Sequence, residues 1–287
     1  MVISMPKNVK AVIDILEKNG HEAYIVGGCV RDELLGRTPK DYDVATSAVP
    51  EETKQCFRNF KVVETGLKHG TVTVITNGES FEVTTFRKDG SYSDRRRPDS
   101  VVFSSKLEDD LARRDFTVNA MAYNSRRGLI DLYGGQKDLF RRRIVCVGDP
   151  EKRFGEDALR IMRALRFASE LGFSPEKNTA EAAHKMKDLL EEISAERVAK
   201  ELLLLLCGTS PFEVLTEFSD VIAEIVPEIE PCIDFDQHSK YHIYDVWTHT
   251  ASAVERSEAD PNVRLDEAVL SGRLHLLSVF LHPPHQN

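Results

Sequence analysis

A short apolar run that ends in two glycines is the feature that most constrains how this chain folds. Residues 23–26, Ala-Tyr-Ile-Val, have the composition of a buried strand. Gly27 and Gly28 follow directly, and the lack of a side chain lets their backbone N–H groups approach an anion where a helix begins. The sequence therefore predicts a buried strand and a helix joined by an anion-binding turn.

Two carboxylates, Asp41 and Asp43, stand one residue apart shortly after this turn. If residues 40–44 are extended, both side chains point to the same side, because side chains alternate along a strand. Two such charges repel each other unless a cation lies between them, and Mg²⁺ commonly takes one or two carboxylates together with substrate phosphates. This combination predicts phosphoryl or nucleotidyl transfer.

An aspartate pair of this spacing also has a simpler interpretation, since aspartates often serve surface turns and helix caps. In isolation the simpler interpretation would be preferred. The segment Gly-Gly-x-x-Arg-Asp at residues 27–32 lies directly upstream and favours the metal site instead.

The bulk properties narrow the class of protein. The chain has 287 residues, enough for two or more domains with cores of their own. No apolar stretch is long enough to cross a membrane, and the first residues lack the apolar region of a signal peptide. The five cysteines are widely spaced and odd in number, which is typical of free thiols in a reducing compartment. We therefore expect a cytoplasmic protein with no membrane partner and no structural zinc site.

Arginine is clustered although the formal net charge is −9. Short runs of arginine occur at residues 95–97, 113–114, 126–127 and 141–143. A single run is most often a solvated surface, but four runs in one segment favour a locally basic groove on an acidic body.

The pattern of apolar residues divides the chain into an α/β part and a helical part. Helical spacing predicts helices at 9–18 and 30–35 and one that opens at Pro50, and strands are expected at 61–64, 71–76 and 80–86. A charged loop is expected at 87–99. From residue 149 onward, helices are predicted at 154–171, 179–190 and 195–206, with no strand after Cys146.

Three further segments carry polar groups suited to nucleotides. Residues 111–120 combine two arginines with Asp115 and Asn119, and residues 131–139 place a glycine pair, a possible hinge, between a strand and a helix. On the helix predicted at 154–171, four charged residues recur at steps of three: Asp157, Arg160, Arg163 and Arg166. The alternative for these four is an ion-pair ladder on a solvated helix.

These segments together resemble the class II tRNA nucleotidyltransferase and bacterial poly(A) polymerase family. The matching stretches are 27–32, 34–37 with 41–43, 113–120, 131–139 and 156–166, in the order of the family. The resemblance implies an α+β fold: a polymerase-β-like head with a mixed sheet and helices at 1–140, then an all-α neck at 141–210. A partial helical body with an incomplete HD-like segment would follow at 211–287.

The resemblance also implies a role for each matching residue. Asp41 and Asp43 would hold two Mg²⁺ ions, one activating an RNA 3′-hydroxyl and one carrying the incoming triphosphate. Gly28 and Arg31 would bind the triphosphate, and Arg114 with Asp115 and Asn119 would bind the ribose. Asp157 and Arg160 would recognise the base, with Arg163 and Arg166 in support. The segment 193–197 with Glu201 would stabilise the neck, and Glu82 is the candidate for a third carboxylate.

The activity implied is template-independent addition of C and A to the 3′ end of tRNA from CTP and ATP. A loop at 87–98 resembles one that A-incorporating members possess, which argues against a CC-only enzyme. An A-adding enzyme, a poly(A) polymerase and a catalytically weak nucleotide- or RNA-binding fragment remain alternatives. The sequence leaves the oligomeric state open.

The C-terminal region departs from the family pattern. Residues 240–250 resemble the opening of an HD-type domain, but no His-Asp pair follows between 263 and 287. An HD phosphohydrolase is therefore not expected, and His242 and His249 are interpreted as relics or core residues. The tail itself suggests a truncation or a shifted reading frame, which predicts weakened binding of tRNA.

Overall fold

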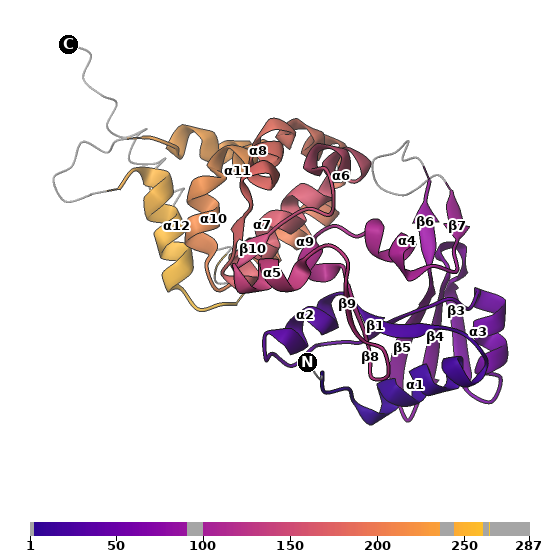
Figure 1. Cartoon of the computed structure of the whole chain (residues 1–287). Helices are drawn as coiled ribbons and strands as arrows, with labels where there is room; N and C mark the ends of the chain where they lie inside the picture. The colour runs from indigo at the N-terminus through magenta and orange to yellow at the C-terminus, as the bar shows by residue number, and fades with distance from the viewer. Residues whose placement is uncertain (1–2, 91–99, 236–243, 261–263, 265–287) are drawn as a thin grey trace, which may run out of the picture. The chain divides into compact units, whose positions relative to one another are not determined.

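The computed structural model describes residues 3–90, 100–235, 244–260 and 264 (Figure 1). The described chain forms two compact units. The first comprises residues up to 141 together with 145–149, and the second comprises 142–144 and the described residues from 150 onward. The division predicted at residues 140 and 210 stays a prediction.

The first unit is built on one mixed sheet of seven strands. Their order is β3 (Lys61–Gly66), β4 (Thr71–Thr76), β5 (Glu79–Thr85), β2 (Asp43–Thr46), β1 (Ala23–Val26), β8 (Met121–Asn124) and β9 (Gly128–Asp131). Only β2 and β5 run parallel; all other neighbours are antiparallel. The four residues of β1 are all buried, as expected of an apolar strand inside a sheet.

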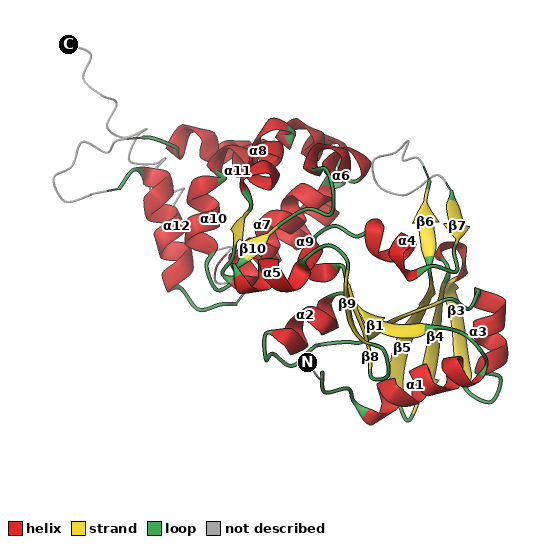
Figure 2. Cartoon of the chain, viewed as in Figure 1, coloured by secondary structure: helices red, strands yellow, loops and turns green. Residues whose placement is uncertain are grey.

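Helices and turns complete the first unit (Figure 2). They are α1 (Lys7–Lys18), α2 (Gly28–Leu34), α3 (Pro50–Cys56), α4 (Leu107–Ala112), the 3₁₀ turn η2 (Thr117–Asn119) and α5 (Gly135–Phe140). Helix α1 packs on β1 and α3, and α3 also packs on β4 and β5. The glycine pair before α5 is a capped turn, because the Asp131 carboxylate accepts the N–H of Gly135 at 2.7 Å.

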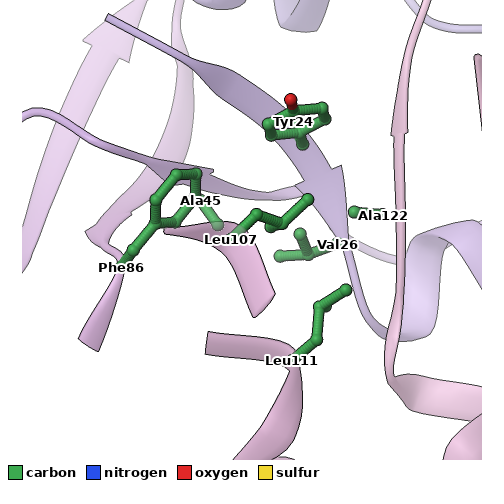
Figure 3. Close-up of a cluster of buried hydrophobic side chains, with 7 residues drawn as sticks. All are labelled: Tyr24, Val26, Ala45, Phe86, Leu107, Leu111 and Ala122. Atoms are coloured by element: carbon green, nitrogen blue, oxygen red, sulfur yellow. The ribbon is translucent and has the colours of Figure 1, made fainter. Parts of the chain in front are cut away.

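An apolar cluster fixes α4 against the centre of the sheet (Figure 3). Tyr24 and Val26 lie two residues apart on β1 and so share one face of the sheet. Tyr24 pairs with Ala45 of β2, and Val26 pairs with Ala122 of β8, which brings all four onto that face. Leu107 and Leu111 of α4, together with Phe86, cover them. The charged residues that follow α4 are therefore held near the end of β1.

Residues 87–89 are a strand, not part of a loop. β6 (Arg87–Asp89) pairs antiparallel with β7 (Val101–Phe103), so the loop predicted from 87 onward is wrong at its start. The error is understandable, because each strand is three residues long and is formed by a partner distant in the sequence. The rest of the predicted loop, residues 91–99, lies outside the described residues.

The second unit is predominantly helical, as predicted. Its helices are α6 (Pro150–Glu156), α7 (Leu159–Leu171), α8 (Lys177–Lys185), α9 (Ala195–Leu206), α10 (Pro211–Glu217), α11 (Ser219–Ile225) and α12 (Val246–Arg256). A small parallel pair joins β10 (Arg143–Ile144) to β11 (Ser174–Pro175), so the prediction of no strand after Cys146 is wrong at one point. The described residues contain no helix long and apolar enough to cross a membrane.

The helix predicted at 154–171 is two helices. It breaks at residues 157–158, where the Asp157 carboxylate accepts the N–H of Leu159 at 3.2 Å and so caps the start of α7. The helix predicted at 179–190 likewise ends at Lys185 and continues as a 3₁₀ helix, η3 (Lys187–Glu192). In both places the apolar residues keep their helical spacing through the break, but a local turn ends the first helix.

Removing the side chain that joins α4 to the sheet should destabilise the protein. Leu111→Ala deletes a side chain with 0 % exposure, and we expect the free energy of unfolding to fall by about 2–5 kcal/mol. Leu132→Ala makes the same change at a residue that is 49 % exposed and should cost less than about 1 kcal/mol. Urea denaturation followed by circular dichroism measures both. Equal losses would show that the α4 contact is not a core contact.

Candidate active site

The turn after β1 needs glycine for two reasons. Gly27 has φ +79°, a conformation that side chains disfavour, and its N–H donates to the Met121 carbonyl at 3.1 Å. A Cβ at this position would lie 2.8 Å from Nη1 of Arg114, so the guanidinium group rests directly against the turn. Helix α2 begins at the next residue, Gly28, two residues before the predicted start. The predicted strand, glycine turn and helix are all present.

Strand pairing brings the carboxylates to this turn. In the antiparallel pair of β1 and β2, Asp43 lies opposite Val26, the last residue before Gly27. The strand begins at Asp43, so the extended segment expected over 40–44 is shorter than predicted. Tyr42, between the two aspartates, donates its hydroxyl to Glu33 of α2 at 2.7 Å and ties this segment to the helix.

Asp43 lies among negative charges. Partial burial, followed by the charges of Asp41 and Glu82, raises the pKa of Asp43 from an ordinary 3.8 to about 6, and Arg114 acts in the opposite direction. The influence of Glu82 follows from the sheet, because Val44 pairs in parallel with Val83, which places the preceding residues on one common face. A divalent cation would relieve this repulsion.

The donor set fits a magnesium ion that shares its ligands with a substrate. Asp41 and Asp43 supply carboxylate oxygens, and Mg²⁺ characteristically takes one or two carboxylates with phosphate oxygens and water. The described residues contain no group of three or more His, Cys, Asp or Glu side chains placed to hold a metal, and Glu82 stays a prediction as a third carboxylate. The pair of aspartates is therefore the candidate metal site.

The residues expected to bind triphosphate and ribose form one connected network. Arg31 is buried; its Nη1 donates to Oδ1 of Asn119 at 2.8 Å and its Nε donates to Asp32 at 2.9 Å. The Asn119 amide in turn donates to Asp115 at 3.2 Å, and Asp115 also accepts the N–H of Phe116 at 2.8 Å. These bonds set the side-chain positions before any ligand binds.

Arg114 is held by a carboxylate that the sequence analysis did not single out. Its Nη2 donates to Asp110 at 3.1 Å, and Nη1 donates to the Asn119 carbonyl at 3.4 Å. Arg113 also donates to Asp110, at 3.0 and 2.7 Å. The spacing of Asp110 from Arg113 and Arg114 indicates these pairs in the sequence, because residues three and four apart on a helix are neighbours.

The arginine runs serve different purposes, and those in the described first unit do not gather into one groove. Arg113 and Arg114 bind Asp110, whereas Arg126 pairs with Asp14 and Glu17 on α1. Residues 141–143 are exposed, and the run at 95–97 lies outside the described residues.

The candidate base-recognition residues belong to the second unit. Asp157 stands between α6 and α7 rather than on a helix, and Nη2 of Arg197 lies 3.6 Å from it. Burial raises the pKa of Asp157, while the positive charges of Arg197, Arg160 and Arg163 oppose this. Arg197 comes from the segment expected to stabilise the neck, and it was missed as a partner of Asp157 because only the fold brings the two together.

The four charged residues spaced by three do not form the alternative ion-pair ladder. Arg160 is buried and donates to Glu156 at 2.9 Å and to the Arg153 carbonyl at 3.1 Å. Arg166 instead binds Glu201 of α9 at 2.6 Å and Glu170 at 2.8 Å. Arg163 stands over the ring of Phe167, 5.3 Å from its centroid. Arg160 therefore joins α7 to α6, and Arg166 joins α7 to α9.

The HD-like segment supports no metal site in the part of the chain that the structure describes. His249 lies on α12, and His242 lies outside the described residues. The described residues hold no suitable cluster of His, Cys, Asp or Glu around His249. The predicted tail at 263–287 is likewise outside the described residues, apart from Arg264.

Two known domain families match the chain. Residues 23–145 match the poly A polymerase head domain, and residues 172–232 match the probable RNA and SrmB-binding site of polymerase A. The first match covers β1, the glycine turn, the aspartate pair and the Arg114 network. Fold and motifs thus define a nucleotidyltransferase of the poly(A) polymerase class.

Full-length relatives identify the family more closely. The CCA-adding enzyme of Ligilactobacillus salivarius (strain UCC118) is 43% identical over 271 residues, which cover 91% of this chain and 67% of the relative. That of Bacillus cytotoxicus is 52% identical over 202 residues, covering 70% of this chain and 50% of the relative. The crystal structure of the Bacillus stearothermophilus CCA-adding enzyme in complex with CTP aligns with a TM-score of 0.70 and 36% identity, covering 96% of this chain and 70% of that chain. The chain belongs to the CCA-adding enzyme family, and it spans two thirds of the first relative and half of the second.

The charge on Asp43 should destabilise the metal-free protein. The folded pKa of Asp43, about 6, exceeds the ordinary 3.8. The loss of stability caused by its charge is therefore absent below about pH 4 and complete above about pH 6. Asp43→Asn removes the charge and with it this loss of stability. Since solvent contact screens the repulsion, we expect the free energy of unfolding to rise by about 1 kcal/mol at pH 8 and to stay unchanged near pH 4. Urea denaturation in EDTA at both pH values measures it. A variant less stable than wild type at pH 8 would contradict the repulsion.

Proposed function

We propose that this chain is a Mg²⁺-dependent tRNA nucleotidyltransferase that adds C and A to the 3′ end of tRNA from CTP and ATP. The observation that carries the proposal is the pairing of Asp43 with Val26, which puts the aspartate pair beside the Gly27–Gly28 turn and Arg114. Carboxylates for a metal and cations for a triphosphate thus lie at one end of β1. The names of the relatives support CCA addition.

In this proposal the first unit performs the chemistry. The RNA 3′ oxygen bonds to the α-phosphorus of the nucleotide while the bond to pyrophosphate breaks, and pyrophosphate leaves. Asp41 and Asp43 would hold Mg²⁺, whose chemistry there is to acidify the 3′-hydroxyl and to neutralise the triphosphate. Gly28 lets the phosphates approach the backbone, and Arg31 supplies positive charge, while Arg114 would contact the ribose. Asp115 and Asn119, positioned by Arg31, would accept from and donate to the ribose hydroxyls.

The second unit would select the base. Cytosine and adenine both carry an exocyclic amine that a carboxylate such as Asp157 can accept from, and Arg160 can donate to a ring acceptor. Glu156 holds Arg160, and Arg197 lies beside Asp157, so both groups are restrained. Arg163 and Arg166 would support the same residues. A template made of side chains accounts for specificity without a nucleic-acid template.

One alternative of the same family is favoured by a specific observation. The head domain matched at residues 23–145 is named for poly A polymerase, so an A-adding or polyadenylating enzyme would use the same metal and triphosphate groups. The segment 87–98, whose sequence resembles one that A-incorporating members possess, is compatible with either product. The tRNA 3′ end, CTP and ATP are the partners that we propose.

We also propose that the protein works in the cytoplasm. All five cysteines are free, and Cys29, Cys146 and Cys232 are buried. Burial raises the pKa of the Cys29 thiol to about 12, which keeps it protonated and unreactive. A chain with unpaired thiols of this kind suits a reducing compartment.

Single-turnover extension of tRNA transcripts tests the proposed activity. The transcripts lack the whole CCA end, lack only the final A, or are complete, and CTP and ATP are supplied separately and together. We expect stepwise addition of C, C and A that stops there, and a loss of at least about 10³-fold in rate for Asp41→Ala/Asp43→Ala, since the metal ligands are gone.

Three results of this assay would contradict the proposal. Addition of A alone or of a longer A tail would make the chain an A-adding or polyadenylating enzyme. No extension despite intact binding of CTP would make it a nucleotide-binding fragment without the transfer activity. Extension that persists in the double variant would remove the aspartates from the mechanism.

Binding of CTP should depend on the Gly27 turn. Gly27→Ala places a methyl group where Nη1 of Arg114 now rests, so we expect CTP affinity to fall about tenfold as the guanidinium moves. Gly78→Ala is the matched control, because Gly78 has the same positive φ, +82°, with nothing within 4 Å of an added Cβ. Calorimetric titration with CTP and Mg²⁺ measures both, and an equal effect of the two variants would assign the loss to backbone strain alone.

A further inference from the structure

Helix α4 carries a buried carboxylate, Asp110, that accepts a hydrogen bond from Arg114 of the candidate site. Asp110 has 0 % exposure, although ionised carboxylates are almost never fully buried unless they are paired. It lies one residue before Leu111, which belongs to the apolar cluster that fixes α4 on the sheet. The backbone that carries Asp110 is therefore rigidly placed.

Each carboxylate oxygen of Asp110 takes one arginine. Oδ1 accepts from Nε and Nη2 of Arg113 at 3.0 and 2.7 Å, and Oδ2 accepts from Nη2 of Arg114 at 3.1 Å. Burial by itself would raise the pKa of Asp110, but Arg114 and Arg113 outweigh it and hold the pKa below its usual range. One negative charge thus anchors two neighbouring positive charges.

The two arginines point to different parts of the first unit. Nη1 of Arg114 donates to the Asn119 carbonyl and lies against the Gly27 turn. Its positive charge opposes the rise in the pKa of Asp43. Nη1 of Arg113 instead lies 4.0 Å from Oδ2 of Asp89 on β6. Asp110 therefore neutralises two neighbouring positive charges that would otherwise repel each other.

We propose that Asp110 is a positioning residue for nucleotide binding, which holds the guanidinium group of Arg114 against the Gly27 turn so that it meets the bound nucleotide. The inference rests on the proposed function, because it takes the ligand of that turn to be a nucleoside triphosphate. A long side chain that is already fixed loses less freedom when the ligand binds. Without Asp110, Arg114 is both repelled by Arg113 and free to adopt other rotamers.

Binding of CTP in the presence of Mg²⁺, measured by calorimetry on the full chain, tests this role through a double-mutant cycle. Asp110→Asn keeps the size of the side chain, removes its charge and presents an amide N–H₂ to one arginine. We expect CTP affinity to fall about tenfold in the wild-type background. In the Arg114→Ala background the same substitution should have no further effect, whereas in the Arg113→Ala background it should still weaken binding about tenfold.

A matched control lies next to Asp110 on the same helix. Asp109 instead accepts a hydrogen bond from Ser104 and pairs with Lys88, so Asp109→Asn should leave CTP affinity unchanged. Asp110→Glu keeps the charge and should restore most of the affinity that Asp110→Asn loses. Circular dichroism at the assay temperature shows that each variant is folded.

The outcomes separate a positioning role from a structural one. If Asp110→Asn weakens CTP binding equally with and without Arg114, it acts through the general structure and the inference is overturned. Unchanged or tighter binding by Asp110→Asn also overturns it. If the wild-type chain binds CTP but does not extend RNA, the proposed transfer activity fails, while the cycle still decides the role of Asp110.

Discussion

The antiparallel pairing of β1 with β2 is the constraint on which the candidate active site depends. One register places Asp43 opposite Val26, and so sets the first carboxylate of β2 beside the glycine turn. The same register turns Tyr24, Val26 and Ala45 to one face, where α4 covers them. A shift of the register by one residue would turn Asp43 to the other face of the sheet and remove the apolar surface on which α4 packs. Burial of an apolar cluster thereby fixes the position of charged groups.

Charge is balanced locally in the first unit. Asp41, Asp43 and Glu82 concentrate negative charge near the start of β2, and burial together with this repulsion raises the pKa of Asp43. Arg31 and Arg114 lie on the other side of the turn, each already held by a carboxylate or amide. A ligand that brings phosphates together with a divalent cation would satisfy both sets of charges. Such a ligand would offset the repulsion between the carboxylates.

Sequence alone predicted the elements whose signals are local. The strand Ala23–Val26 and the helix Ala195–Leu206 have the predicted bounds, because apolar period and flanking glycines mark them fully. The break before α7 was missed, since the aspartate that caps it lies within an unbroken helical period. The short β6 was missed because its three residues are all charged and carry no strand signal. Likewise the aspartate pair could be found from spacing, but the pairing of Arg197 with Asp157 exists only in the folded chain.

A crystal structure of the chain with CTP and Mn²⁺ tests the central claim most directly, because Mn²⁺ replaces Mg²⁺ at oxygen ligands and gives an anomalous signal. The account predicts a Mn²⁺ peak bound by Asp41 and Asp43, with the triphosphate at the Gly27–Gly28 turn and the ribose in contact with Arg114. A triphosphate bound elsewhere, or Mn²⁺ that binds without either aspartate, would contradict the account.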